Sequence, residues 1–402
     1  MIPSENLKFR HRRYDTPARG YKFPGGTYQY GFCLNSKDQT LSVWDCSTDT
    51  ITATVTLAAS KNFACAFYRS IDKSVYVLGT SGWLDRVDLD PDSGTFCTVV
   101  ESGDRQVGSA AACYLPYPFD GLIPGRADIA YDFDYIPIDK INDTANFRNR
   151  RTRQKDGRFY SEPPRFGHQN IVHASYHPTY NMLQVENQFF DILVGTNDYR
   201  TDYKFKFRGN DILAFTGVGQ GANQLAGSNV FTYLFKNFLL AATGGSCYVI
   251  GRGSNTHLYQ TLTHGCGSSG RFFYEYDPFS RRVMMQGKLA TQGSVFELGN
   301  GQLTDLGDLS RATYLATNET GTEDMAFNPV YKKVYVQGRR HGASGETGVD
   351  KIYVYDLAQS LGSMYLGAIT VGGNAGAERA SAYAVNMIGF NGNRYFESDH
   401  AI

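Results

Sequence analysis

Four stretches of this chain share one side-chain pattern, and that pattern constrains the fold more than any other feature of the sequence. In each stretch an aromatic residue precedes a turn, and an alternating apolar run begins seven positions after the aromatic residue. The aromatic residues and the aliphatic residues that follow them are Tyr68 and Val75, Tyr176 and Leu183, Tyr276 and Val283, and Phe327 and Val334. Alternation on both sides of a turn predicts strand, tight turn and strand.

The spacing of these hairpins indicates a repeat. The aliphatic positions Val75, Leu183, Val283 and Val334 lie 108, 100 and 51 residues apart, so the first two intervals are twice the third in rough terms. Each double interval leaves room for one degenerate copy of the same unit. Repeats of about fifty residues in strand-rich sequence predict the radial blades of a β-propeller rather than a helical solenoid.

One complete unit can be followed through residues 62–100. Apolar runs predict strands at residues 63–67, 74–78 and 83–89. Pro91, Asp92, Ser93 and Gly94 predict a turn, which leads into a fourth strand at residues 95–99. Four antiparallel strands joined by short turns make one propeller blade.

The two ends of the chain complement each other. Residues 41–55 predict strand, turn and strand without an inner strand, and residues 382–388 predict a strand with no outer hairpin after it. Pairing them in one blade closes the ring and removes exposed sheet edges. We therefore predict an all-β fold, a β-propeller of seven four-stranded blades closed by its N- and C-terminal strands. Six blades are the alternative, because the unit near residue 128 is disrupted.

The motifs resemble those of seven-bladed β-propellers of the WD-repeat and YVTN-repeat type. Residues 41–45, Leu-Ser-Val-Trp-Asp, end a strand, and the turn Thr48-Asp49-Thr50 that follows is similar to the outer-strand motif of those repeats. The resemblance covers most of the chain as a pattern, and two or three blades match it well. The sequence has no consistent Gly-His opening and no repeated Trp-Asp pair.

Two basic segments depart from the blade pattern. Residues 1–26 are predicted to form an extended N-terminal arm, and residues 27–402 a single propeller domain with an inserted arginine-rich loop near residues 140–169. We expect both segments to contact other subunits of a large assembly, since arginine is enriched at protein interfaces. The expected contact residues are Lys8, Arg10, Arg12, Arg13, Arg148, Arg150, Arg151 and Arg153. The chain has 39 basic and 39 acidic residues, so nucleic acid is not an expected partner.

Three carboxylates are the first candidates for a central pocket. Asp128, Asp132 and Asp134 would share one face of a strand, and paired carboxylates carry out glycoside hydrolysis. A glycan-binding or glycoside-hydrolysing propeller with a central acidic pocket is therefore one alternative for the function.

A second set of carboxylates favours ordinary structure. Asp88, Asp90 and Asp92 alternate as they do in a calcium loop, but Val99 stands where that loop needs a bidentate glutamate. A hairpin turn is the favoured interpretation. We expect no metal site, no cofactor and no catalytic residue in this chain.

One turn position differs in every copy of the hairpin. His177 occupies the position that the other copies fill with Arg69, Asp277 and Asn328. This variety predicts a tolerant surface site.

The cysteines and the N-terminus bear on the compartment. Seven cysteines without paired spacing favour reduced thiols. The N-terminus lacks the apolar run of a secretory signal, and no stretch is long enough to cross a bilayer. We expect synthesis in a cytoplasm and no membrane insertion.

The composition suggests a function only by analogy. A propeller with 28 Tyr, 26 Phe and 43 Gly but no active-site motif resembles the propellers that decorate tails, collars or capsids of large phages. That resemblance implies a non-enzymatic structural protein of a phage or virus particle, located in the virion, with a host surface receptor or glycan as a further candidate partner. An intracellular peptide-binding scaffold is a second alternative.

Overall fold

The fold is built almost entirely of strands. The computed structural model describes residues 27–35, 38–61, 63–79, 83–104, 272–277, 279–287, 292–299, 302–310, 319–340, 351–371 and 388–392, and between them the strands β8 to β18. In this part of the chain one short 3-10 helix, η3 (Leu361–Ser363), stands among 27 strands. The predicted all-β class is confirmed.

The described strands form seven antiparallel sheets, six with four strands and one with three. The first contains β27 (Ile388–Phe390), β1 (Tyr30–Asn35), β2 (Thr40–Asp45) and β3 (Thr50–Thr56). The second contains β4 (Phe63–Arg69), β5 (Ser74–Gly79), β6 (Trp83–Asp88) and β7 (Val99–Asp104). The third contains β8 (Ala111–Leu115), β9 (Gly121–Gly125) and β10 (Ile136–Pro137).

The remaining four sheets follow the chain in the same order. The fourth contains β11 (Ala174–His177), β12 (Met182–Val185), β13 (Gln188–Val194) and β14 (Tyr203–Gly209). The fifth contains β15 (Thr232–Phe235), β16 (Phe238–Thr243), β17 (Ser246–Gly251) and β18 (His257–Thr263). The sixth contains β19 (Phe272–Asp277), β20 (Arg282–Gly287), β21 (Gln292–Gly299) and β22 (Gln302–Ser310). The seventh contains β23 (Glu319–Asn328), β24 (Lys333–Arg340), β25 (Lys351–Tyr355) and β26 (Tyr365–Thr370).

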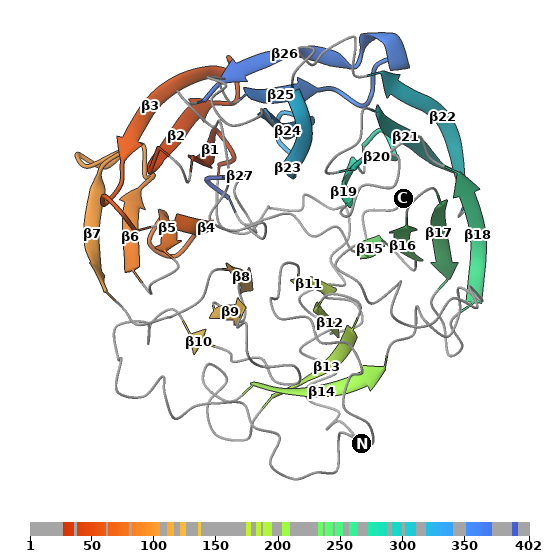
Figure 1. The fold of residues 1–402 in the computed structure, drawn as a ribbon, viewed down its shortest axis with the longest axis horizontal. Coiled ribbons are helices and arrows are strands. Elements are labelled where there is room, and N and C mark those ends of the chain that lie inside the picture. Colours follow the sequence, from red (N-terminus) through yellow and green to blue (C-terminus); the bar gives the residue numbers. More distant parts are fainter. Residues whose placement is uncertain are drawn as a thin grey trace.

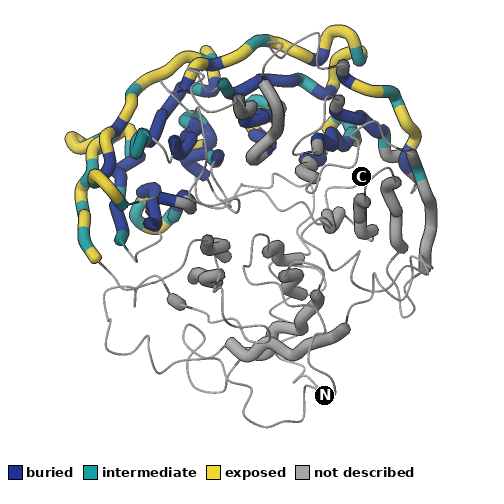
Figure 2. Tube along the Cα trace, in the orientation of Figure 1, coloured by how far each residue is buried: buried dark blue, intermediate teal, exposed yellow. Residues whose placement is uncertain are grey.

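The sheets are arranged like the blades of a propeller. Figure 1 shows them around a common centre, each with one strand towards the centre and another at the rim. Because neighbouring strands are antiparallel, the connections from first to second strand and from third to fourth strand lie at one end of the ring. We call this the turn end. Burial follows the same geometry in the coloured sheets of Figure 2, the first, second, sixth and seventh: their middle strands are mostly buried and their outermost strands mostly exposed.

The repeated hairpins have the register that the sequence predicts. Tyr68 lies opposite Val75, Tyr176 opposite Leu183, Tyr276 opposite Val283, and Phe327 opposite Val334. The spacing of seven therefore records a direct cross-strand pair, which is the contact that fixes strand register. The fifth sheet contains the expected degenerate copy, in which Tyr233 lies opposite Leu240.

Two copies of the variable turn position are buried, whereas Arg69 is partly exposed; the side chain of His177 lies outside the described residues, so a tolerant surface site there stays a prediction. Asp277 and Asn328 are 1% and 0% exposed. Asp277 Oδ1 accepts a hydrogen bond from the Phe279 N–H at 2.9 Å. Asn328 Oδ1 accepts from the Val330 and Tyr331 N–H groups at 3.0 and 3.1 Å. Aspartate and asparagine side chains close turns in this way, so in these two copies the residue is a short acceptor that stabilises the turn.

The first sheet contains a hairpin made from the two ends of the described chain. β27 pairs with β1, and Gly31 lies opposite Phe390. Asn391 follows β27, and its Oδ1 accepts from the Tyr30 N–H at 2.9 Å. The backbone carbonyl of Asn391 accepts from the Thr27 N–H at 3.0 Å. The predicted strand at residues 382–388 overlaps β27 only at its last residue, and residues 382–387 lie outside the described residues.

The fourth strand of the second sheet begins later than predicted. The predicted strand at residues 95–99 is mostly turn, and β7 runs from Val99 to Asp104. Asp88 causes the difference. Its Oδ2 accepts from the Thr95 hydroxyl at 2.6 Å, and its backbone carbonyl accepts from the Cys97 N–H at 2.9 Å. These bonds hold residues 89–98 in one long turn, with Cys97 in the left-handed region at a φ of 60°.

Candidate functional site

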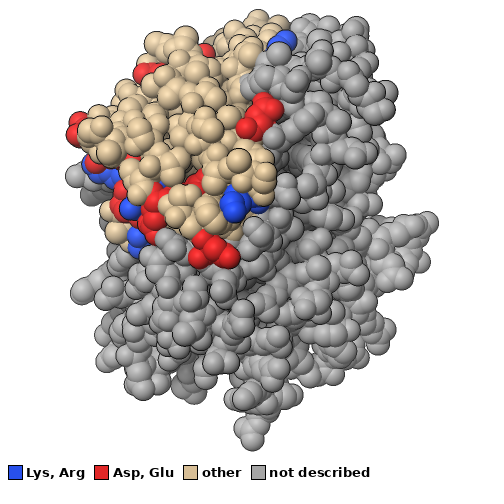
Figure 3. All heavy atoms as spheres, turned by 60° about the vertical axis from the view of Figure 1, so that its left-hand side comes forward, with Lys and Arg blue, Asp and Glu red and all other residues tan. Residues whose placement is uncertain are grey.

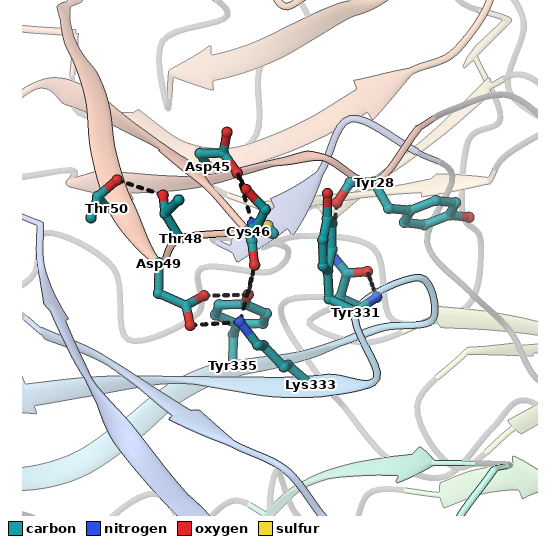
Figure 4. Close-up of polar contacts among 11 residues, drawn as sticks. Tyr28, Asp45, Cys46, Thr48, Asp49, Thr50, Tyr331, Lys333 and Tyr335 are labelled. Carbon is teal, nitrogen blue, oxygen red and sulfur yellow. Dashed lines mark hydrogen bonds and ion pairs between the residues drawn. The ribbon is translucent and has the colours of Figure 1, made fainter.

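A cluster of polar contacts joins the seventh sheet to the first (Figure 4). Lys333 Nζ lies 2.7 Å from Asp49 Oδ2 and donates to the Cys46 carbonyl at 3.1 Å. The Tyr335 hydroxyl donates to Asp49 Oδ1 at 2.7 Å. Asn328 Nδ2 donates to the backbone carbonyl of Tyr28 at 2.7 Å. We call these six residues, Tyr28, Cys46, Asp49, Asn328, Lys333 and Tyr335, the clasp.

The clasp has the electrostatics of a structural contact. Burial raises the pKa of Tyr335 above its usual 10.0, and Cys46 and Asp49 add to the rise. Burial also raises the pKa of the Cys46 thiol from its usual 9.0 to about 12. Both groups therefore keep their protons at neutral pH, and a nucleophile or general base needs the opposite. The clasp therefore has the character of a structural contact that holds two sheets together.

An aromatic cluster lies directly beside the clasp. The rings of Trp44 and Tyr335 are 5.7 Å apart, and the rings of Tyr335 and Phe390 are 5.3 Å apart. A Cβ atom on Gly31 would lie 2.2 Å from Trp44 Cε2, so only glycine allows β1 to pass this close to the indole. Residues from both ends of the chain thus share one core.

Contacts equivalent to the clasp join two other pairs of neighbouring sheets. We call the boundary between two neighbouring sheets a seam. Lys333 is the first residue of its strand and reaches the turn between the third and fourth strands of the next sheet. Arg282, the first residue of β20, donates to the Leu357 and Gln359 carbonyls at 2.6 Å each, in the equivalent turn of the seventh sheet. Tyr30, the first residue of β1, places its ring 4.9 Å from that of Phe96 in the second sheet. One strand position therefore joins sheet to sheet at three successive seams.

A buried carboxylate lies at the end of the ring opposite the turn end. Asp85 is fully buried, and its Oδ1 accepts from the Trp83 indole N–H at 2.9 Å and from the Ser102 hydroxyl. Its Oδ2 accepts from the Ala58 N–H at 2.7 Å. Lys61 Nζ lies 3.6 Å above the centre of the Trp83 ring. Both carboxylate oxygens are bound to the protein, so Asp85 fixes the link between the first and second sheets against the second sheet.

The carboxylates of the predicted calcium or turn motif belong to a turn. Hydrogen bonds from Ser93 and Thr95 outweigh burial and hold the pKa of Asp88 below its usual value. Asp90 Oδ2 lies 2.8 Å from Lys73 Nζ, and Asp90 Oδ1 accepts from the Asp92 N–H. Among the described residues no group of three or more His, Cys, Asp and Glu side chains could hold a metal ion.

The predicted pocket and interface residues lie outside the described residues. Asp128, Asp132 and Asp134 belong to the stretch that joins β9 to β10. The basic residues are Lys8, Arg10, Arg12 and Arg13 in residues 1–26 and Arg148, Arg150, Arg151 and Arg153 in residues 138–173. Their predicted contacts with other subunits stay predictions. In the described part of the chain no helix is long and apolar enough to cross a membrane.

Sequence reasoning missed Asn391 and the clasp. Phe390 and Asn391 repeat the pair formed by Phe327 and Asn328, so a search for an aromatic residue followed by Asp or Asn would have found them. No comparable sequence signal marks the clasp, because Lys333 and Asp49 are 284 residues apart.

No family model matches this sequence, and no curated protein matches it. Solved structures do share its fold. A functionally unknown protein from Desulfotomaculum acetoxidans DSM 771 gives a TM-score of 0.54 at 14% identity, over 91% of this chain and 99% of that chain. A candidate 6-phosphogluconolactonase from Bacteroides fragilis NCTC 9343 gives 0.54 at 13% identity, over 86% and 96%. The periplasmic gluconolactonase of Pseudomonas aeruginosa gives 0.53 at 10% identity, over 86% and 97%. The chain therefore has a propeller-like all-β fold.

These likenesses correct the predicted function. One neighbour above is a gluconolactonase and another a candidate 6-phosphogluconolactonase, whereas the sequence had suggested a non-enzymatic component of a phage or virus particle. That prediction is wrong, and so is the exclusion of an enzyme, while nothing in the comparisons supports the virion location. The error came from reading the lack of a local catalytic motif as the lack of a site. In a ring of blades, pocket residues can come from separate loops and form no motif.

Proposed function

We propose that this chain is an enzyme that hydrolyses the lactone of a sugar acid. The observation that carries the proposal is the likeness to two lactonase-type proteins, which extends over 86% of this chain and over 96% and 97% of those chains. A match over the whole ring supports a shared central channel, which is the feature that blades build together.

The proposed site uses the carboxylates of the stretch between β9 and β10. Lactone hydrolysis adds water to the acyl carbon, breaks the bond from that carbon to the ring oxygen and leaves a sugar acid. A carboxylate can take the proton of the attacking water, and the ring oxygen becomes a hydroxyl when it receives a proton. Asp128, Asp132 and Asp134 are our candidates for these roles. β9 and β10 are the second and third strands of their sheet, so the stretch leaves and rejoins the sheet at the end opposite the turn end.

The test measures acid release from glucono-1,5-lactone and 6-phosphoglucono-1,5-lactone by the purified chain, relative to the spontaneous rate. We expect hydrolysis of at least one lactone, and a loss of about 100-fold or more in kcat/KM for Asp132→Asn, as general-base catalysis predicts. Asp305→Asn is the matched control, because Asp305 is exposed on the outer strand β22. No hydrolysis of either lactone would overturn the proposed activity. Hydrolysis that survives substitution of Asp128, Asp132 and Asp134 one by one would overturn the proposed site.

Glycoside hydrolysis is the second candidate, because the same three carboxylates suit that reaction. Nitrophenyl glycosides distinguish the two activities, since they contain a glycosidic bond and no lactone. Release of nitrophenol by the wild type but not by Asp132→Asn would favour the glycosidase.

We also propose that the seven sheets form a closed, seven-bladed ring. The pairing of β27 with β1 supports closure, and so does the clasp, which repeats the contact of Arg282 at an internal seam. Cys33 lies opposite Ile388, so closure predicts that Ile388→Cys forms an intramolecular disulfide on mild oxidation. Mass spectrometry of the digested protein detects the linked peptides, and a Cys33→Ser background is the control. Linkage of the introduced thiol to a cysteine other than Cys33, or no linkage, would contradict closure in solution.

A further inference from the structure

Two neighbouring hairpin turns expose apolar side chains at the turn end. Phe279 lies in the turn between β19 and β20 and is 51% exposed, and Val330 lies at the equivalent position between β23 and β24 and is 46% exposed. The Phe279 ring lies 6.3 Å from the ring of Phe327, and Lys332 Nζ lies 4.8 Å from its centre. The two turns are therefore in contact, and their apolar side chains belong to one surface rather than to two separate ones.

Each of these turns also carries an exposed cation. Arg281 and Lys332 lie two residues after the apolar side chains, and both are in the left-handed region, at φ values of 61° and 56°. That region favours glycine or asparagine, so backbone preference does not account for a long cation at either position. We call Phe279, Arg281, Val330 and Lys332 the tip patch. Its chemistry suits a partner that is both apolar and acidic.

An equivalent turn in the second sheet has the same pattern but a different charge balance. Ile71 is 62% exposed, and Lys73 has a φ of 51°. Lys73 Nζ lies 2.8 Å from Asp90 Oδ2, and Asp72 lies between the apolar residue and the cation. In the tip patch the nearest acid on the same turn is Asp277, which is buried and closes that turn. An acidic partner is therefore expected to prefer the tip patch.

The C-terminal segment, residues 393–402, begins beside the tip patch. It follows Gly392, where a Cβ atom would lie 2.6 Å from Tyr28 Cε1. The carbonyl of Tyr28 in turn accepts from Asn328, the residue that precedes the turn of the seventh sheet. An extended chain covers about 3.3–3.6 Å per residue, so Phe396 can reach about 13 Å from Gly392. This segment can therefore reach the tip patch.

The composition of the C-terminal segment matches the tip patch. Two adjacent aromatic residues are followed by two acids, against a single arginine: Tyr395, Phe396, Glu397, Asp399 and Arg394. The other segment that joins the ring at the turn end, residues 1–26, has six Lys and Arg residues against two acids. Its cations would face the cations of the tip patch, so charge favours the C-terminal segment.

We propose that residues 393–402 dock on the tip patch of their own chain. The aromatic pair packs on Phe279 and Val330, and the acids lie beside Arg281 and Lys332. The rim of the ring suits an acidic segment less well. In Figure 3, which brings the left-hand side of Figure 1 forward, the described surface has a broad uncharged area, with charged side chains of both signs at its margins.

Photo-cross-linking in the full chain tests the contact. Benzoylphenylalanine in place of Phe396 bonds under ultraviolet light to side chains that it touches, and mass spectrometry of the digested monomer identifies them. We expect links to residues 279–282 or 329–333. The same replacement of Phe9 is the control for the N-terminal segment and should give no such link. Links from position 396 to other parts of the chain or to a second molecule, no link at all, or links to the tip patch from position 9 would overturn the proposal.

Two sets of variants test the chemistry of the contact. Phe279→Ser/Val330→Ser should lower the yield of the link about tenfold, as the loss of an aromatic contact predicts. Ile71→Ser, at the equivalent exposed position of the second sheet, should leave the yield unchanged.

Charge reversal is the second set. Arg281→Glu/Lys332→Glu should lower the yield about fivefold, and adding Glu397→Lys/Asp399→Lys to the same chain should restore it. A yield that neither set of patch variants lowers, that Ile71→Ser lowers equally, or that the added lysines fail to restore would contradict docking on this patch.

Discussion

The hairpin between β23 and β24 and the hairpin between β27 and β1 have the same design but different connections. In the first, four residues join the strands, and Asn328 closes the turn by accepting from two N–H groups that follow it directly. In the second, the strands come from opposite ends of the chain, and Asn391 accepts from Tyr30, which is 361 residues away. The Asn391 side chain thus makes a hydrogen bond like the one that closes the turn after Asn328, although no turn of the chain connects β27 to β1.

The difference shows that a pair of strands without a covalent connection needs additional contacts to stay together. In the covalent hairpin, β23 and β24, the short connection keeps the two strands at a high effective concentration. In the split hairpin, β27 and β1, non-covalent contacts alone hold the two strands together. The clasp and the ring cluster of Trp44, Tyr335 and Phe390 supply those contacts next to the split hairpin. The four predictions that follow compare this seam with its covalent equivalents.

Removal of the strand that closes the split hairpin should have the largest effect. A chain that ends at Met387 lacks β27, so it loses the contacts of Phe390 with Tyr28 and Tyr335 and leaves the edge of β1 open. We expect a fall in Tm of about 10 °C or more, or failure to fold, because loss of one buried phenylalanine alone costs about 3–5 kcal/mol. Thermal unfolding followed by circular dichroism measures the change.

A chain that ends at Gly392 is the control for this truncation. It keeps β27 and Asn391, and its Tm should fall by less than about 3 °C. If both truncations lower Tm equally, residues 393–402 rather than β27 stabilise the seam.

The second comparison removes the turn-closing asparagine from each hairpin. Asn391→Ala leaves the Tyr30 N–H without its partner, and Asn328→Ala does the same to Val330 and Tyr331. We expect Asn391→Ala to lower the free energy of unfolding by about 2–3 kcal/mol and Asn328→Ala by about 1–2 kcal/mol. The smaller loss is expected for Asn328→Ala because the chain still connects β23 to β24 when the hydrogen-bond acceptor is gone. Urea unfolding of both variants measures this order, and the reverse order would show that connectivity contributes little to the first sheet.

The third comparison sets the clasp against an internal seam. Lys333→Met removes an ammonium group that binds Asp49 and the Cys46 carbonyl, whereas Arg282→Met removes the contact with Leu357 and Gln359. We expect losses of about 2 kcal/mol and about 1 kcal/mol in the free energy of unfolding. The chain already links the sixth sheet to the seventh, so the internal seam depends less on this contact. Equal losses would mean that the two seams are energetically alike.

The sequence predicted hairpins well because their cause is local. An aromatic residue and an aliphatic residue seven positions apart face each other across a turn, and both are needed to fill the space between sheets. The register of Tyr276 and Val283 could therefore be read directly. Prediction failed for residues 95–99, where side-chain bonds of Asp88 extend the turn through an apolar stretch that resembles a strand. Alternation alone does not detect such bonds.

The site could be predicted much less well than the fold. Asp128, Asp132 and Asp134 were chosen for their chemistry, and their contribution to a pocket stays a prediction. The clasp depends on pairs such as Tyr335 and Asp49, which the chain brings together only when distant sheets meet. A pattern search along the sequence finds neighbours in the chain, whereas a seam joins residues that are neighbours only in space.

The fourth prediction concerns the buried thiol of the clasp and has the smallest expected effect. The pKa of Cys46 is raised from its usual 9.0 to about 12 in the folded chain, so the folded state holds a proton that the unfolded state releases above pH 9. Its contribution is fully present below pH 9 and is lost as the pH rises towards 12. We expect the free energy of unfolding to fall by about 1.4 kcal/mol per pH unit for this proton, and Cys46→Ala to remove that component of the slope. Urea unfolding at about pH 8, 9 and 10, on both sides of the usual thiol pKa, compares the two slopes. Cys33→Ala, in the same core cluster, is the control for the loss of a buried thiol, and a slope that Cys46→Ala leaves unchanged would assign the alkaline loss of stability to groups other than the Cys46 thiol.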